Sequence, residues 1–512
     1  MSNYGRRWLA LAAAAVFAAC TPAAHSPAAV KPVASGFDRG MWLEDYAALR
    51  GRLEHTYANL AWFGSPEGGV DVPTLHARTL ATLESATDPG AAEAAIDAFV
   101  VAFHDGHFSR LPPKLVPESA PIAKVSPPGR SFAPTLGCAA LGYARTRGVA
   151  FSVRFEASPG FRLLSAGEPE SFRSGMASMP GGRTLGILRI PSFRSADFVA
   201  ECEQAWGEIA RAQPSGVCDK GCARAISRRV MVLALTALQT RLRALVGASA
   251  VVVDLGGNGG GNDLGDWAPR AFTKSPVRSA RLGVVRDPQS VKYFEEQLDD
   301  LREAQQAETS EKARDVLAQA RREYERLEAL TKGPAPCAMG WVWRERHAWK
   351  PLESHASCTN LLFGPMYASG VSDYLPEGAL GSPKAEEAIY WPSIAHPFVG
   401  SWSGPVYVIV DERTGSAAEM AAAVFRNNEV ARILGTKTAG SGCGFMYSGS
   451  EFTLPHSRLR YRIPNCVRLR ADGSSEVAGV RPDIELPSYE GEGEPERAMR
   501  FLAAIARDLP AR

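Results

Sequence analysis

Ser416 is the residue of this chain that is best placed to act as a nucleophile. It follows residues 406–410, a β-branched run typical of a buried strand, and it precedes Ala417 and Ala418, which are strong helix formers. A serine at such a junction presents its hydroxyl on a rigid turn, and the first free N–H groups of the helix point toward any oxyanion that forms beside it. The segment therefore has the pattern of a nucleophile turn.

The same serine also fits a purely structural role. Ser416 and Glu419 have the S-x-x-E spacing of a capping box, in which a serine and a glutamate bind free backbone N–H groups at the start of a helix. Taken alone, this segment favours the cap over the nucleophile.

A second segment, also an apolar run followed by a turn, shifts the interpretation of Ser416 from a helix cap toward a nucleophile. Residues 250–253 form another apolar run, which is followed by Asp254 and the glycine-rich turn Leu255-Gly-Gly-Asn-Gly-Gly-Gly-Asn262. The turn is not a phosphate cradle, because no Gly-Lys-Ser/Thr follows and the spacing differs from the dinucleotide-binding G-x-G-x-x-G. The glycines instead permit positive φ values, which turn backbone N–H groups toward a substrate carbonyl.

The two turns together resemble those of the S41 serine peptidases, a family that includes the tail-specific peptidases and the tricorn core. The family carries an Asp-Leu-Arg-x-Asn-x-Gly-Gly turn and a Thr-x-Ser-Ala-x-Glu turn. The matching residues here are Asp254, Leu255, Asn258, Gly260 and Gly261 in the first, and Thr414, Ser416, Ala417 and Glu419 in the second. Further matches follow in family order at 105–107, 185–193, 435–440 and 479–485, so that the resemblance spans about residues 40–487.

The resemblance implies a histidine as the general base. Tail-specific relatives use a lysine in a Gly-Lys-Gly turn, but the corresponding segment here is Gly440-Ser441-Gly442, and Lys437 stands four residues too early. His107 occupies the position at which the tricorn-like branch carries its base, and a neutral imidazole suits proton transfer at neutral pH. His104 competes for this role by proximity.

Two further assignments follow from the catalytic reading. The N–H of Gly260 or of Gly261 would join that of Ala417 in an oxyanion hole, where one donor is typically worth about 3 kcal/mol. A histidine base also needs an orienting partner. The sequence leaves Asp105 and Glu419 open for this role.

The amino terminus resembles a bacterial lipoprotein signal. Arg6 and Arg7 precede a short apolar run, and Phe17-Ala-Ala-Cys20 then resembles a lipidation site with Cys20 as the modified residue. Phe17 stands where leucine is usual, which leaves plain secretory cleavage as the alternative. Residues 21–36 are rich in alanine and proline and read as a tether. We expect the protein on the periplasmic side of a bacterial cell envelope, with a lipid anchor as its only membrane contact.

Cysteine usage agrees with export to an oxidising compartment. Eight cysteines remain after Cys20, an even number that suits disulfides. The spacings favour Cys218 with Cys222, Cys337 with Cys358 and Cys443 with Cys466, which leaves Cys138 and Cys202. No metal site is expected, because the chain has no CxxC pair.

The order of the segments predicts an α/β fold, for which the family implies a crotonase-like ββα-spiral core. We assign residues 1–20 to the signal, 21–36 to the tether, 37–125 to a helical domain and 126–182 to a small β-rich segment, which could be a degenerate PDZ-like unit. Residues 183–490 form the peptidase core, interrupted by a helical insertion at about 289–332, and residues 491–512 form a terminal helix. The net charge of +2 gives no case for nucleic acid.

These observations predict an exported serine endopeptidase that acts on protein or peptide substrates without a cofactor. One alternative is a non-catalytic peptide- or ligand-binding protein on the same scaffold. The other is a hydrolase of small esters.

Overall fold

A computed structural model describes residues 37–113, 133–169, 171–210, 218–333, 339–352, 359–447 and 450–510 of the chain. Residues 39–512 form one compact unit. The proposed signal and tether lie outside the described residues, as do Cys337 and Cys358. None of the described helices is long and apolar enough to cross a membrane.

Seven strands form the main sheet, in the order β13-β9-β8-β5-β4-β3-β2. Their bounds are β2 (Arg162–Ala166), β3 (Arg173–Ser178), β4 (Thr184–Arg189), β5 (Ala250–Asp254), β8 (Val406–Val410), β9 (Arg432–Gly435) and β13 (Ile484–Glu485). Neighbours from β13 to β4 pair in parallel, and β3 and β2 continue the sheet antiparallel. Strands β5 and β8 are buried at every residue, which is why both read as continuous apolar runs.

Helices cover both faces of this sheet. Val251 and Val253 belong to the same apolar cluster as residues of α6 (Val199–Ile209), α7 (Lys220–Ala244), α8 (Leu264–Trp267) and α12 (Ala417–Asn427). Val252, which points to the opposite face, packs in a second cluster with residues of α13 (Glu494–Asp508). Helix α5 (Pro134–Ala140) packs on α6, and the Cys138–Cys202 disulfide joins the two.

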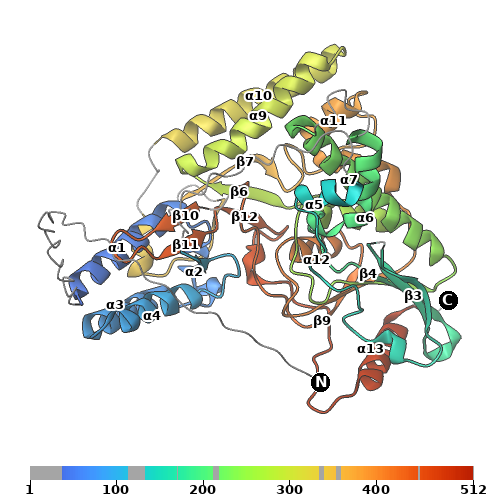
Figure 1. The fold of residues 1–512 in the computed structure, drawn as a ribbon, viewed down its shortest axis with the longest axis horizontal. Coiled ribbons are helices and arrows are strands. Elements are labelled where there is room, and N and C mark those ends of the chain that lie inside the picture. The colour runs from blue at the N-terminus through green and yellow to red at the C-terminus, as the bar shows by residue number, and fades with distance from the viewer. Residues whose placement is uncertain are drawn as a thin grey trace, which may run out of the picture. The chain divides into compact units, whose positions relative to one another are not determined.

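The helical N-terminal region contains α1 (Arg39–Thr56), α2 (Leu60–Phe63), α3 (Val72–Ser85) and α4 (Pro89–Val101). The chain then enters β1 (Ser109–Leu111), which pairs antiparallel with β11 (Arg460–Ile463), and β11 pairs with β10 (Ser450–Thr453). Figure 1 shows these late strands beside the early helices. This pairing fixes the segment just before β1, which contains His107.

The expected helical insertion corresponds to α9 (Val291–Ala307) and α10 (Glu311–Lys332), which lie alongside each other (Figure 1). Their apolar side chains cluster with residues of a second small sheet, in which β6 (Arg281–Val285) lies between β12 (Cys466–Leu469) and β7 (Leu361–Tyr367). Helix α11 (Pro383–Ile389) packs against α9.

The structure confirms the α/β class and the helical N-terminal region. In the segment 126–182, expected to be small and β-rich, β3 pairs with β4 and β2 pairs with β3, so that both strands extend the main sheet. Among the described residues, this segment has no sheet of its own that would correspond to a PDZ domain.

Candidate active site

Ser416 lies at the junction of β8 and α12 in a strained conformation. Its φ of 53° and ψ of −121° lie outside the β region that a helix N-cap normally adopts. A positive φ is uncommon for a residue with a side chain and persists only where the surroundings enforce it. Ser416 is half-buried, and its own N–H donates to Glu419 Oε2 at 3.1 Å. The backbone geometry therefore indicates more than a helix cap.

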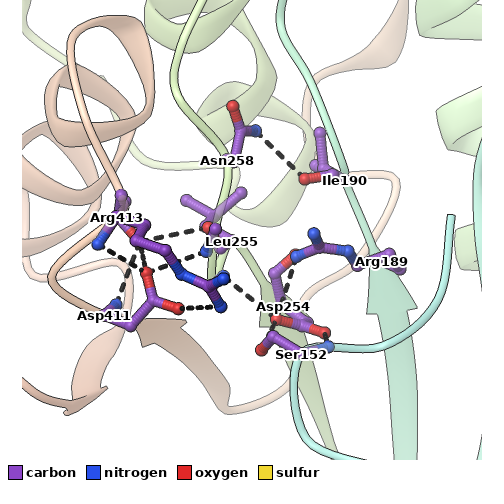
Figure 2. A network of polar contacts seen from close by, with 11 residues as sticks. Ser152, Arg189, Ile190, Asp254, Leu255, Asn258, Asp411 and Arg413 are labelled. Atoms are coloured by element: carbon purple, nitrogen blue, oxygen red, sulfur yellow. Dashed lines mark hydrogen bonds and ion pairs between the residues drawn. The ribbon is translucent and has the colours of Figure 1, made fainter. Parts of the chain in front are cut away.

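The glycine turn is anchored at its start by Asp254, which is fully buried (Figure 2). This carboxylate accepts hydrogen bonds from the backbone N–H of Ser152 at 2.6 Å and of Gly256 at 3.1 Å. The Ser152 hydroxyl and Arg189 Nη1 also donate to it. Asp254 thus has its acceptor capacity used within the scaffold, which makes it a structural residue.

Asn258 fastens the glycine turn to the nucleophile turn. Its side-chain Nδ2 donates to the carbonyl of Ile190 at 3.0 Å (Figure 2), and its backbone carbonyl accepts the N–H of Gly415 at 3.0 Å. A second link runs the other way, because the Thr414 hydroxyl donates to the carbonyl of Leu255 at 3.1 Å. The two motifs that stand apart in sequence are therefore interlocked by direct hydrogen bonds.

Gly260 packs directly on the first residue of α12. A Cβ atom on Gly260 would lie 2.6 Å from the Ala417 nitrogen, and φ is +92°, so that only glycine fits. The N–H of Gly260 is engaged, because it donates to Asn258 Oδ1 at 2.8 Å. Among the described residues, the N–H groups of Gly261 and Ala417 have no acceptor. Of the two glycines left open by the sequence, Gly261 is therefore the one with a free donor.

His107 is oriented by a backbone carbonyl. Its Nδ1 lies 2.9 Å from the Ser441 carbonyl oxygen. A carbonyl can only accept, so Nδ1 must carry the proton, and Nε2 is left with a lone pair. Burial lowers the pKa of His107, and the negative charge of Asp105 opposes this effect. The imidazole is thus held neutral, in the tautomer that a general base requires.

Asp105 positions the backbone of His107 and has no hydrogen bond to its ring among the described residues. Its Oδ1 accepts the N–H of His107 at 3.0 Å, while Oδ2 accepts from Tyr57 Oη at 3.0 Å and Asn59 Nδ2 at 2.9 Å. Burial raises the pKa of Asp105, and its hydrogen bonds oppose the rise. The residue ties the His107 turn to the N-terminal helical region.

Glu419 holds the turn that carries the Ser441 carbonyl. Its carboxylate is fully buried and accepts from Thr438 Oγ1 at 2.6 Å. It also accepts the backbone N–H groups of Gly440 at 2.6 Å, Ser441 at 2.7 Å and Gly442 at 3.2 Å. Burial raises the pKa of Glu419, and the Thr438 hydroxyl and the backbone donors oppose it. The two carboxylates that the sequence left open therefore both support turns, and the imidazole is oriented by a carbonyl.

The nucleophile and base turns meet at the side chain of Ser441. A Cβ on Gly415, the neighbour of Ser416, would lie 3.2 Å from Ser441 Oγ. A Cβ on Gly106, the neighbour of His107, would lie 2.6 Å from the same atom. In the described part of the chain, Ser416 Oγ and the imidazole are not hydrogen-bonded to each other, and such bonds are often long before substrate binds.

The structure adds residues that the motifs did not reveal. Arg468 Nη2 lies 3.0 Å from the Gly442 carbonyl and 3.5 Å from that of Ser416, and its Nε donates to Glu476. Gly444 packs on the base, since a Cβ there would lie 2.7 Å from His107 Nε2. No motif in the sequence pointed to Arg468. The 440–442 turn was interpreted only for its missing lysine, so the packing of Gly444 on His107 was not predicted.

The two competing bases lie elsewhere. Lys437 and His104 are both exposed and line a cavity of about 880 Å³ on the outer side of the 437–440 turn. The aliphatic part of Lys437 packs close to Gly479. In the described part of the chain, neither side chain has a hydrogen bond to the 440–442 turn, whereas His107 Nδ1 is bonded to the Ser441 carbonyl, which favours His107.

Three disulfides among the described residues match the expected pairing, including the leftover pair Cys138–Cys202. Cys443–Cys466 joins the residue before Gly444 to β12, with a sequence separation of 23 residues. Cys218–Cys222 closes a small loop of separation 4 at the start of α7.

Removing the Cys443–Cys466 disulfide should therefore lower both stability and turnover. In the Cys443→Ala/Cys466→Ala variant, the chain-entropy estimate is a loss of about 3 kcal/mol in the free energy of unfolding. The Gly444 backbone that packs on His107 also loses the covalent link beside it, while the hydrogen bond from the Asn465 N–H to its carbonyl remains. The Cys218→Ala/Cys222→Ala variant should lose about 2 kcal/mol with kcat unchanged. Thermal unfolding and peptidase turnover of the two variants, measured side by side, check this. Equal effects on kcat would contradict the link to the active site.

Comparisons with known proteins show the family of the chain. Residues 184–486 match the sequence model of peptidase family S41. The chain belongs to this family and is a serine peptidase. No curated protein matches the chain in sequence.

Solved structures show the same fold. The crystal structure of mature CPAF has a TM-score of 0.54 at 16% identity, covering 91% of this chain and 96% of that one. Mature CPAF complexed with lactacystin has a TM-score of 0.54 at 15% identity, covering 91% and 97%. A CPAF mutant has a TM-score of 0.51 at 14% identity, covering 92% and 97%. At these identities the likeness concerns the fold alone.

Proposed function

We propose that this peptidase cleaves peptide bonds inside protein or peptide substrates with Ser416 as nucleophile and His107 as general base. The observation that carries the proposal is the pairing of a strained, half-buried Ser416 with an imidazole whose Nδ1 donates to Ser441. The two turns that bear these residues pack on the same serine side chain.

The chemistry follows from the protonation state of His107. Nε2 accepts the proton of the Ser416 hydroxyl as Oγ bonds to the substrate carbonyl carbon, and the N–H groups of Gly261 and Ala417 stabilise the oxyanion. The imidazolium then gives its proton to the leaving amine, and the peptide C–N bond breaks. Water repeats the cycle on the acyl-enzyme, returning the serine hydroxyl and releasing the new carboxyl group.

A fluorophosphonate probe tests this assignment, because it labels only an activated serine. We expect the wild-type chain to be labelled and Ser416→Ala to remain unlabelled. Ser441→Ala is the matched control, since it removes the neighbouring hydroxyl and keeps the carbonyl that orients His107, so labelling should persist. A folded wild-type protein that the probe does not label would favour the non-catalytic binding alternative.

We also propose that the protein is exported and lipid-anchored through Cys20 in a bacterial cell envelope. The support is the signal-like sequence before Cys20 together with the three disulfides, which suit an oxidising compartment. Intact protein should partition into detergent with a lipid mass on Cys20, and Cys20→Ser should be released or mislocalised. Recovery of a mature form that begins at another residue and carries no lipid would contradict the anchor.

A further inference from the structure

A second recess lies against the glycine turn, apart from the residues assigned to catalysis. It has a volume of about 310 Å³, and residues 256 and 257 of the turn form part of its wall. This size is at the lower end of the range of ligand sites. The supporting side chains that Figure 2 draws, Ser152, Arg189 and Arg413, also line it.

The charge of this recess is strongly unbalanced. Its lining contains four arginines, at 147, 154, 189 and 413, against one carboxylate, Glu494. In the described part of the chain, Arg147 and Arg154 make no ion pair, and Arg413 has only Asp411, at 3.5 Å. Arg189 is itself paired with Asp254 at 3.1 Å, so the charge without an ion pair among the described residues is that of Arg147 and Arg154, and an anion bound between the guanidinium groups would relieve their repulsion.

Two of the arginines lie close to the backbone of the glycine turn. Arg147 Nη2 lies 3.0 Å from the position that a Cβ atom on Gly259 would occupy. Arg413 Nη2 lies 3.7 Å from the corresponding position on Gly257. The absence of side chains on the turn thus leaves room for both guanidinium groups close to its backbone.

Arg189 gives the recess a fixed polar group. The residue is only 6% exposed, and its Nη1 donates to the carbonyl and Oδ1 of Asp254, both at 3.1 Å. Its Nε is buried and has no hydrogen-bond partner. The Asp254 carboxylate also accepts hydrogen bonds from Ser152 and Gly256, which leaves it no acceptor capacity for a further bond from Arg189. A buried guanidinium with an unused donor costs free energy, and the bonds to Asp254 hold Arg189 as a positively charged group of fixed position in the wall of the recess.

We propose that this recess is a binding site for an oxyanionic group, a carboxylate or a phosphate. The planar guanidinium fork matches both groups in a bidentate manner, which a lysine cannot do. The anion has two natural sources, an acidic residue of a bound peptide and a free inorganic anion. The site lies beside the turn that carries Gly261 and does not depend on the proposed catalytic chemistry.

Isothermal titration calorimetry with two probes tests the site and separates its sources. Inorganic phosphate is titrated into the wild-type chain, and triglutamate into the Ser416→Ala chain, which prevents cleavage. The Arg147→Gln/Arg413→Gln variant, made in each background, removes two exposed guanidinium groups and should fold normally. Arg243→Gln, an exposed arginine on α7 without an ion pair among the described residues, is the matched control.

We expect at least one probe to bind, with its Kd raised tenfold or more in the double variant and unchanged in Arg243→Gln. Raising the salt concentration should weaken binding, because the contacts are ionic. Binding of phosphate alone identifies a free anion as the ligand, and binding of triglutamate alone identifies a peptide subsite. If neither probe binds the parent chain more tightly than the double variant, the proposal is wrong, whatever the outcome of the serine-labelling experiment.

Discussion

His107→Ala should lower kcat/KM by about 10⁴- to 10⁶-fold, the loss expected when one member of a cooperating catalytic set is removed. The reason is that the Ser441 carbonyl holds the proton on Nδ1 of His107, which leaves the lone pair of Nε2 free to accept the serine proton. His104→Ala and Lys437→Ala are the matched controls. Both residues are exposed on the outer cavity, and each variant should stay within about tenfold of wild type. A larger loss for Lys437→Ala than for His107→Ala would overturn the assignment of the base.

The pH dependence of kcat/KM gives an independent check on His107. Protonation of Nε2 removes the acceptor, so activity should fall as the pH drops through the imidazole pKa. Burial lowers that pKa below the ordinary value of about 6.5, with Asp105 opposing. The acid limb of the profile should therefore lie below pH 6.5, and an acid limb well above that value would indicate another base.

Gly444→Ala should lower kcat by about 10²-fold or more, because catalysis is sensitive to a displacement of the base of about 1 Å. The added Cβ would lie 2.5 Å from Cδ2 and 2.7 Å from Nε2 of His107, so that the ring must move. The backbone is at φ +72°, which alone costs an alanine about 1 kcal/mol. Steady-state kinetics and thermal unfolding of the variant measure the two effects.

Gly491→Ala separates the contact from the backbone strain. Gly491 has φ +76°, almost the same as Gly444, but a Cβ there would meet nothing within 4 Å. This variant should lose a similar amount of stability and keep its kcat within about twofold. Equal losses of kcat in the two variants would mean that the packing of Gly444 on His107 does not position the base.

The local elements were predictable because their signals are local. Strands β5 and β8 are buried on both faces, and the continuous apolar runs at 250–253 and 406–410 predicted them. The strand-to-helix junction at Ser416 was visible as a run of β-branched residues followed by alanines. In the segment 126–182, alternation indicated short strands, and the structure contains β2 and β3 there; alternation does not show which strands they pair with.

The sequence by itself determined the family, the nucleophile turn, the glycine turn and the absence of the lysine from the 440–442 turn. These features depend on residue type and short spacing, which a single chain displays directly. It also favoured His107, and it narrowed the oxyanion donor to Gly260 or Gly261.

Only the tertiary structure decided how these parts are oriented. The Ser441 carbonyl binds His107 across 334 residues, and the engagement of Gly260 by Asn258 leaves Gly261 as the free donor. The tertiary structure also decided the roles of Asp105 and Glu419, whose carboxylates both accept backbone N–H groups of turns. Backbone carbonyls and N–H groups are identical in every residue, so their roles leave no mark in a sequence and appear only once the chain is folded.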